Sequence, residues 1–253
     1  MAVNLYFVGT AGSGKTTMTR SFKLWMERQG YQAIVVNLDP GAEDLPYEAD
    51  IDIRDWVSLG EVMREHELGP NGAQIDCADM IAMNAREIRE VMDEYECHYF
   101  LIDTPGQMEL FTFRESSREV VRTLGDKSLI NFLFDPILSK QPSGFVSLLL
   151  LAATTQFRFD VPYFPVISKA DMIREEDLEK IQTWAQDHWK LDMPLRDQGS
   201  RDTQVALELV KSLQNMGLQQ IMPAVSAREE YGFEEIYTAV QDSFFGGEDL
   251  QID

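Results

Sequence analysis

An eight-residue segment near the N-terminus narrows the possible folds of this chain more than any other segment. Residues 9–16 read Gly-Thr-Ala-Gly-Ser-Gly-Lys-Thr, a complete GxxxxGK[ST] pattern that follows an apolar run and precedes a helical pattern. The glycines let backbone N–H groups face a phosphate, and the following helix adds the positive end of its dipole. We predict a nucleoside triphosphate site, with Lys15 at the β- and γ-phosphates as an exposed loop residue and Thr16 on Mg²⁺. The predicted phosphate-binding residues are Gly12, Ser13, Gly14, Lys15, Thr16 and Thr17.

Apolar, β-rich runs recur along the chain and alternate with helical patterns. The runs cover residues 3–8, 33–38, 99–102, 129–134, 163–167 and 221–225. This alternation predicts an α/β fold, a three-layer P-loop sandwich with a mainly parallel sheet and ligands beyond the carboxyl ends of the strands. We expect one domain over residues 1–253, because 253 residues suit a single large α/β core.

The connection between the second and third predicted strands is too long for a plain crossover. About 60 residues separate them, against roughly a dozen for a single crossover helix. We predict a helical insertion at about residues 45–95, with helices over 57–67 and 78–94 flanking a turn at residues 69–72. Further along, Leu178, Ile181, Ala185 and Trp189 are spaced to share a helix face, and Val205, Leu209 and Leu213 form a second helix that Gly217 ends.

Acidic residues follow two of the predicted strands. Asp103 opens the segment Asp-Thr-Pro-Gly-Gln, which resembles the DxxG switch of GTPases, where the Asp reaches Mg²⁺ through water and the Gly N–H approaches the γ-phosphate. Gly106 is then the phosphate contact, and the Gln107 amide can orient the attacking water. Asp39 ends another strand, and a carboxylate beside phosphates is costly unless it touches the metal or polarises the water. We therefore predict metal ligands at Thr16, Asp39 and Asp103.

Two later segments predict how the base is recognised. Ser168, Lys169, Ala170 and Asp171 resemble the [NT]KxD motif, in which the Asp accepts hydrogen bonds from guanine N1–H and its 2-amino group. Adenine lacks that donor pair, so a desolvated Asp171 would reject it. Ser168 stands where the motif usually has Asn, which leaves the supporting hydrogen bond open. Ser226 and Ala227 resemble the fifth GTPase motif, whose backbone N–H meets guanine O6.

Charge and composition argue against several other classes of protein. The 43 acidic and 22 basic residues give a net charge of −21, which repels nucleic acid and anionic membranes. No apolar run is long enough to span a bilayer, and residues 3–8 are a strand from the outset, so a cytoplasmic location is expected. The two cysteines and three histidines stand at no metal-ligand spacing, so zinc is not expected.

Six segments together resemble the GPN-loop GTPases, P-loop GTPases of the SIMIBI class. Besides residues 9–16 these segments are Asn37-Leu38-Asp39-Pro40, Asp52-Ile53-Arg54-Asp55, Gly69-Pro70-Asn71, Asp103-Thr104-Pro105-Gly106-Gln107-Met108-Glu109 and Ser168-Lys169-Ala170-Asp171. The tripeptide Gly69-Pro70-Asn71 lies in the predicted insertion, where that family carries its name motif. The motifs span most of the chain.

The resemblance implies more than the motifs themselves show. It implies a homodimer in which each chain's loop enters the partner's active site, with Asn71 near the γ-phosphate in place of an arginine finger. It also implies roles for Gln107 and Glu109 around the attacking water, and protein clients such as RNA polymerase assembly intermediates. We therefore expect Mg²⁺-dependent hydrolysis of GTP to GDP and phosphate. A P-loop kinase for a small molecule and a nucleotide-dependent scaffold with little turnover are the alternatives.

Overall fold

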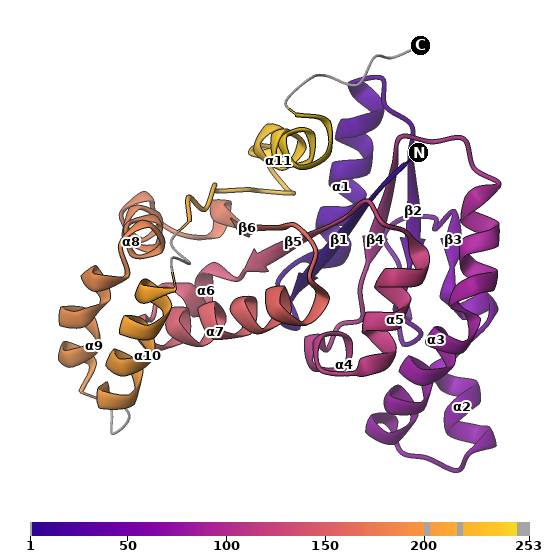
Figure 1. Ribbon diagram of the computed structural model, residues 1–253, viewed down its shortest axis with the longest axis horizontal. Coiled ribbons are helices and arrows are strands. Elements are labelled where there is room, and N and C mark those ends of the chain that lie inside the picture. The colour runs from indigo at the N-terminus through magenta and orange to yellow at the C-terminus, as the bar shows by residue number, and fades with distance from the viewer. Residues whose placement is uncertain (1, 200–202, 217–219, 247–253) are drawn as a thin grey trace.

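A parallel sheet of six strands forms the centre of the molecule (Figure 1). The computed structural model describes residues 2–199, 203–216 and 220–246. The strand order is β3-β2-β4-β1-β5-β6, which confirms the predicted α/β class with a parallel sheet. The strands are β1 Val3–Gly9, β2 Ala33–Asn37, β3 Ile51–Asp52, β4 Tyr99–Asp103, β5 Ser128–Phe134 and β6 Tyr163–Ile167.

The strand register brings polar residues together at one edge of the sheet. Asn37 pairs with Asp103 of the neighbouring strand on one side and with Asp52 on the other. Asp103 also pairs with Phe7, two residues before β1 ends at Gly9. β2 and β4 therefore end, and the glycine-rich loop that follows β1 begins, at the same edge of the sheet. This is the edge at which an open parallel sheet binds its ligands.

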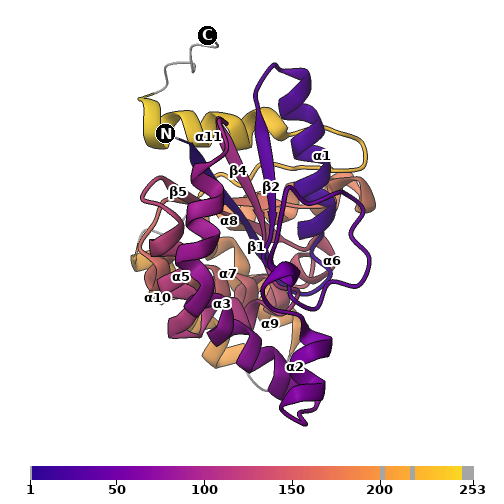
Figure 2. The ribbon, with the colours of Figure 1, turned by 90° about the vertical axis from the view of Figure 1, so that its right-hand side faces the viewer.

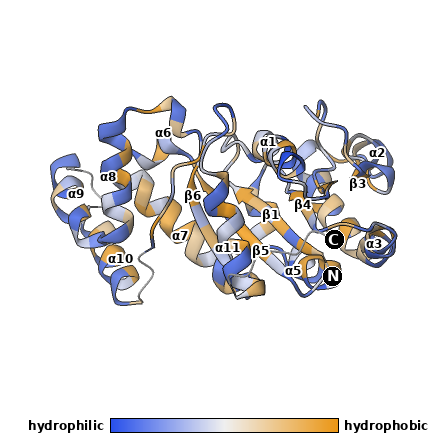
Figure 3. Ribbon diagram, turned by 90° about the horizontal axis from the view of Figure 1, so that it is seen from above, coloured by the Kyte–Doolittle hydropathy of each residue, from blue (hydrophilic) through white to orange (hydrophobic). Residues whose placement is uncertain are grey.

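Helices cover both faces of the sheet, which gives three layers (Figure 2). On one face, helices α1 and α11 pack on β1 through Phe22, Met26 and Phe233. The other face carries the helices between β3 and β6, whose buried side chains form the larger core cluster together with strand residues and with side chains from beyond β6. Hydrophobic residues concentrate on the strands and on helix faces turned toward them (Figure 3). The bounds are α1 Lys15–Arg28, α4 Met108–Thr112, α5 Glu115–Leu124, α6 Pro136–Ser139, α7 Pro142–Phe159 and α11 Phe233–Phe245.

The predicted insertion contains two helices, but its turn is placed differently from the prediction. α2 covers Leu59–Glu65 and α3 covers Pro70–Asp93, so residues 70–72 begin a helix rather than form a turn. Pro70 occupies the first helical position, where its missing N–H costs no hydrogen bond and its φ suits the helix. The chain reverses before it, at Glu67, whose φ is +53°.

Helices α8 Glu175–Gln186, α9 Asp192–Gln198 and α10 Thr203–Asn215 gather beyond β6 (Figure 1). Short 3-10 turns cover Ile53–Asp55, Ala170–Met172 and His188–Leu191. The prediction that Trp189 shares the buried face of α8 is wrong, because Trp189 lies in the last of these turns and is 49% exposed. In α10, Leu213 is buried as predicted but Val205 is exposed, and the proposed cap Gly217 lies outside the described residues.

Two short segments were misjudged from the sequence. Residues 221–225 form no strand, and one parallel bridge joins Ala224 to Ile167. Pro223 interrupts the run and has no N–H to donate, although its carbonyl accepts from Ile167. Strand β3 was not predicted, because two residues are too short for a periodic signal. Within residues 2–199, 203–216 and 220–246, no helix has the length and apolar composition needed to cross a membrane.

Candidate active site

The glycine-rich loop joins β1 to α1, and its lysine is already engaged by the protein. Gly12 and Gly14 have φ of +76° and +98°, a region that residues with a Cβ adopt only under strain. Lys15 is 5% exposed, so the expectation of an exposed side chain is wrong. Its Nζ donates to the carbonyl oxygens of Gly9 at 2.9 Å, Thr10 at 3.3 Å and Gly106 at 3.2 Å. Burial lowers the pKa of Lys15, and the nearby carboxylates of the site oppose that shift.

Several buried polar atoms around the loop have no partner within the described residues. They are Ser13 Oγ, Thr10 Oγ1 and Asp103 Oδ1. A buried polar atom without a hydrogen bond is costly, so such atoms gather where a ligand completes them. Mg²⁺ prefers oxygen ligands such as hydroxyls and carboxylates, and Asp103 Oδ1 has unused lone pairs near Thr16, the second residue of α1. These hydroxyl and carboxylate oxygens therefore suit the binding of a phosphate group together with Mg²⁺.

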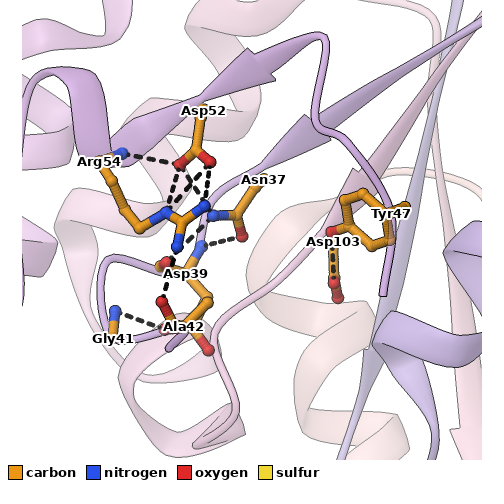
Figure 4. Close-up of polar contacts among 8 residues, drawn as sticks. All are labelled: Asn37, Asp39, Gly41, Ala42, Tyr47, Asp52, Arg54 and Asp103. Atoms are coloured by element: carbon orange, nitrogen blue, oxygen red, sulfur yellow. Dashed lines mark hydrogen bonds and ion pairs between the residues drawn. The ribbon is translucent and has the colours of Figure 1, made fainter. Parts of the chain in front are cut away.

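Asp103 is held in place by a tyrosine that the sequence did not single out. Tyr47 lies in the loop between β2 and β3, and its Oη donates to Oδ2 of Asp103, at the end of β4, at 2.7 Å (Figure 4). Burial raises the pKa of Asp103 to about 6, while hydrogen bonds from Tyr47 and Thr16 and the charge of Lys15 act in the opposite direction. Asp103 is thus a carboxylate with little solvation, whose Oδ2 accepts from Tyr47 while its Oδ1 has no partner within the described residues.

Asp39 lies in the loop after β2 and connects this loop to the segment that follows β4. Its Oδ2 accepts from the Gly106 N–H at 3.0 Å, and its Oδ1 accepts from the Gly41 N–H at 2.9 Å. Gly106 therefore meets Lys15 through its carbonyl and Asp39 through its N–H. The structure brings together three residues from three separate motifs at one point.

On the opposite side of the loop, the residues predicted to read the base are tied to each other. Ser168 Oγ lies 2.9 Å from Ser13 O and 3.1 Å from Phe134 O, within reach of its single hydroxyl proton, so this serine links the base-reading segment to the glycine-rich loop. Ser168 thus contacts the glycine-rich loop from the position where the motif usually has Asn. Ser226 Oγ donates to Asp171 Oδ1 at 2.6 Å, which orients the carboxylate. Ala227 follows Ser226 and is partly buried.

Lys169 lies between these two sides with a left-handed backbone, at a φ of +48°. Its Nζ hydrogen-bonds the Gly12 carbonyl and pairs with Asp135 Oδ2 at 3.0 Å. The aliphatic stem runs past Gly14, where an added Cβ would lie 3.4 Å from Lys169 Cε. Lys169 therefore packs against the glycine-rich loop and is held there by Gly12 and Asp135.

A cavity of about 200 Å³ adjoins Asp39 and separates the sheet edge from the inserted helices. Asp39, Gly106 and Gln107 line one side, and Gln74 and Ile81 of α3 line another. Gln107 is exposed, directly precedes α4, and lines the same cavity as Asp39. Space for a water next to both side chains is therefore available.

Three other predicted residues lie at the margin of the site or outside it. Thr17 is exposed in the first turn of α1. Glu109 is exposed in the first turn of α4, and its charge is felt at Lys15. Asn71 is exposed in the first turn of α3, with no contact to the glycine-rich loop of its own chain among the described hydrogen bonds.

Sequence reasoning missed Tyr47, and it named Asn37, Asp52 and Arg54 only as parts of family motifs, without a role in the site. Asn37 and Asp52 are strand-end polar residues like Asp39 and Asp103, which was a usable signal. Tyr47 lies in an irregular loop 56 residues from its partner, so no pattern pointed to it.

Comparison with known proteins places this geometry in a family. A family model described as "Conserved hypothetical ATP binding protein" matches residues 7–245. GPN-loop GTPase PAB0955 of Pyrococcus abyssi is 33% identical over 245 residues, which are 94% of this chain and 96% of that protein. The chain belongs to the GPN-loop GTPase family. GPN-loop GTPase 3 of Saccharomyces cerevisiae is 31% identical over 249 residues, 95% of this chain and 91% of that protein.

A solved structure agrees with the assignment of this GPN-loop GTPase. The crystal structure of PAB0955, described as a GTPase in apo form, has a TM-score of 0.84 and 32% identity, and the match covers 96% of this chain and 98% of that one. The resemblance drawn from the motifs is therefore confirmed, and this GPN-loop GTPase is a GTP-binding enzyme that hydrolyses GTP.

Proposed function

We propose that this GPN-loop GTPase hydrolyses GTP with Mg²⁺, and that Asp39 and Gln107 position the attacking water. The observation that carries the proposal is the meeting of Lys15, Asp39 and Gly106 at the carboxyl edge of the sheet. Phosphoryl transfer depends on position and charge more than on covalent chemistry, so such convergence of a cation, a carboxylate and an N–H suits it.

These residues share the tasks of the proposed reaction, and Asp39 has two of them, at the water and at the metal. Lys15 binds the β- and γ-phosphate oxygens when it leaves the three carbonyls that it now contacts. The Gly106 N–H, now on Asp39, turns to the γ-phosphate, which leaves that carboxylate oxygen for the water. Thr16, Asp39 and Asp103 would hold Mg²⁺, which when bound neutralises charge on the β- and γ-phosphates. Glu109 lies at the margin of the active site and supports the position of the attacking water.

We further infer that Asp171 selects guanine, although the matching family model is described by ATP. Asp171 is oriented by Ser226, and its segment is tied to the glycine-rich loop by Ser168. A carboxylate fixed in this way accepts two donors from guanine and finds none of that pattern on adenine.

The first experiment measures phosphate release from GTP and ATP by wild type and by Asp39→Asn. GTP should be hydrolysed with no added acceptor, and Asp39→Asn should lose roughly 100-fold or more in kcat while nucleotide affinity is retained. Asp44→Asn is the matched control, an exposed aspartate of the same loop, and it should hydrolyse GTP normally. Phosphate release only with an acceptor would favour the kinase, and tight binding without turnover would favour the scaffold.

We propose that residues 1–253 are one GTPase domain, with the insertion at about 45–95 serving a homodimer. The α2–α3 hairpin extends past the carboxyl ends of the strands (Figure 2). Asn71 is the second residue of α3, next to the turn of the hairpin, and is exposed. An amide projecting from such a hairpin suits contact with the γ-phosphate of a partner chain, where it would donate a hydrogen bond to developing charge.

Subunit mixing tests that proposal. Asn71→Ala should bind GTP and dimerise normally yet lose roughly 10- to 1000-fold in hydrolysis, the cost of one transition-state hydrogen bond. A mixed dimer of Asn71→Ala with Lys15→Ala keeps one site with an intact Lys15 and the partner's intact Asn71, so activity should partly return. Tagged subunits must prove that mixed dimers formed. No recovery in proven mixed dimers would exclude action of Asn71 on the partner.

The family resemblance supports a biological role on protein clients, such as RNA polymerase assembly intermediates. In this proposal the two nucleotide states of the enzyme bind a client differently, and hydrolysis releases it. Co-precipitation of clients with wild type, in GTP analogue and in GDP, tests the idea. Equal capture in both states would contradict a switch.

A further inference from the structure

The Asp52-Ile53-Arg54-Asp55 segment lies beside the active site, yet the proposed reaction assigns it no task. Asp52 ends β3, directly opposite Asn37 at the end of β2. Asn37 Nδ2 donates to Asp52 Oδ1 at 3.0 Å and to the Asp39 carbonyl at 3.3 Å, and Asn37 Oδ1 accepts from the Asp39 N–H at 3.0 Å (Figure 4). Asp52 is therefore joined through one side chain to the backbone of Asp39.

Arg54 adds a second connection between Asp52 and the same loop. Its Nε lies 2.9 and 3.1 Å from the two Asp52 carboxylate oxygens, and its Nη2 lies 2.6 Å from Oδ2. The remaining nitrogen, Nη1, donates to the Ala42 carbonyl at 2.9 Å. The planar guanidinium has donors on two sides, so one side chain can join β3 to the end of the Asp39 turn.

The turn held by these contacts fixes the direction of the Asp39 carboxylate. The Ala42 N–H donates to the Asp39 carbonyl at 3.3 Å, and the Gly41 N–H donates to Asp39 Oδ1 at 2.9 Å. Asn37 therefore fixes the start of the turn, and Arg54 fixes its end. Between them the carboxylate is left with Oδ2 directed at the Gly106 N–H.

The environment of the pair makes it stronger than a surface ion pair. The side chains of Asp52 and Arg54 are 16% and 34% exposed. Burial alone would raise the pKa of Asp52, but hydrogen bonds from Arg54 and Asn37 outweigh it and hold that pKa below its usual value. The Arg54 backbone N–H also donates to Asp52 Oδ1, so the two residues are fixed to each other by main chain and side chain.

We propose that Arg54, paired with Asp52, is a positioning residue for GTP hydrolysis: it holds the turn of residues 39–42 so that Asp39 points at Gly106 and the attacking water. Arg54 touches neither the glycine-rich loop nor the base-reading segment in the described contacts, so it acts through Asp39. This inference rests on the proposed role of Asp39. A misplacement of about 1 Å in a reacting geometry can cost roughly 100-fold in rate, which sets the scale of the effect.

The test combines kinetics with hydrogen exchange in the nucleotide-free protein. Arg54→Ala should lower kcat roughly 10- to 100-fold with GTP affinity within about twofold of wild type. It should also speed deuterium exchange in the peptide containing Gly106, because Asp39 no longer holds that N–H. Arg54→Lys keeps the charge but cannot contact Asp52 and Ala42 together, so its kcat and its exchange at Gly106 should lie between those of Arg54→Ala and wild type. If Arg54→Ala does not fold, Arg54→Lys takes its place in the test.

Two controls separate positioning from general stability. Arg196→Ala breaks a similar two-point contact with Asp192 in α9, far from the site, and should change neither kcat nor exchange at Gly106. In a double-mutant cycle, Arg54→Ala should add little to Asp39→Ala, because the effect passes through that carboxylate. Full additivity, or unchanged kcat and exchange in folded Arg54→Ala, would overturn the inference. Normal hydrolysis by Asp39→Ala would instead refute the proposed function, and the exchange result would still show whether Arg54 holds the turn.

Discussion

Replacing Tyr47 with Phe removes the hydroxyl that donates to Asp103, the most buried carboxylate of the site. Tyr47 Oη lies 2.7 Å from Asp103 Oδ2, and Asp103 is 1% exposed. A hydrogen bond to a charged group contributes about 1.5–3 kcal/mol, and water cannot easily replace it at a buried oxygen. For a domain near this size each kcal/mol shifts the Tm by roughly 2–4 °C, so the variant should melt roughly 3–12 °C lower at pH 8.

The loss should depend on pH in a defined direction. The pKa of Asp103 is raised by burial to about 6, and the Tyr47 hydroxyl opposes that rise, so its removal raises the pKa further. The hydroxyl therefore stabilises the ionised form, so its contribution is full above the raised pKa of the variant, declines between that pKa and about 6, and is largely lost below 6. The Tm difference between wild type and variant should shrink from pH 8 to pH 5.

Calorimetry of the nucleotide-free protein in EDTA measures both effects. Tyr95→Phe is the matched control, because Tyr95 Oη donates to the Asp50 carbonyl at 3.1 Å in an exposed contact, and its Tm should change by only a degree or two. A Tm loss for Tyr47→Phe no larger than that of the control at pH 8 would refute the reasoning. An equal loss at pH 5 and pH 8 would show that packing, and not the carboxylate, is responsible.

Three further predictions concern nucleotide binding by Asp171 and Ser168 and the pH dependence of stability at the buried His188. Asp171→Asn exchanges an acceptor for a donor, so preference should move from GTP to XTP by roughly 100-fold in competition binding; retained GTP preference would remove Asp171 as the base reader. Ser168→Ala loses the link to Ser13 and should weaken GTP binding roughly 3- to 10-fold by calorimetric titration, whereas unchanged affinity would mean that the link is dispensable. Burial lowers the pKa of His188 below its unfolded value, so the unfolded chain binds more protons and stability should fall as pH drops below about 6.5. His188→Leu should flatten that part of the Tm profile, and an unchanged profile would assign the pH dependence to other groups.

Short-range features were readable from the sequence because their chemistry is local. The GxxxxGK[ST] pattern, the strand-ending Asp39 and Asp103, and the Ser168 segment are each defined by a few consecutive residues. Parallel strands end at one edge, so their order along the chain was enough to predict a common site. The α/β class followed from the alternation of strands and helices.

Tertiary structure decided what depends on distant residues. Periodicity could not show that residues 70–72 begin a helix, or that Pro223 leaves residues 221–225 with a single bridge. Nor could it join Tyr47 to Asp103 or Arg54 to the Ala42 carbonyl, because irregular loops have no repeat and their contacts are set by how the strands align. The sequence by itself determined which chemical groups reach the carboxyl edge of the sheet, since that requires only local patterns. Their directions, and the burial that perturbs Lys15 and Asp103, arise only when the sheet and the loops pack against each other.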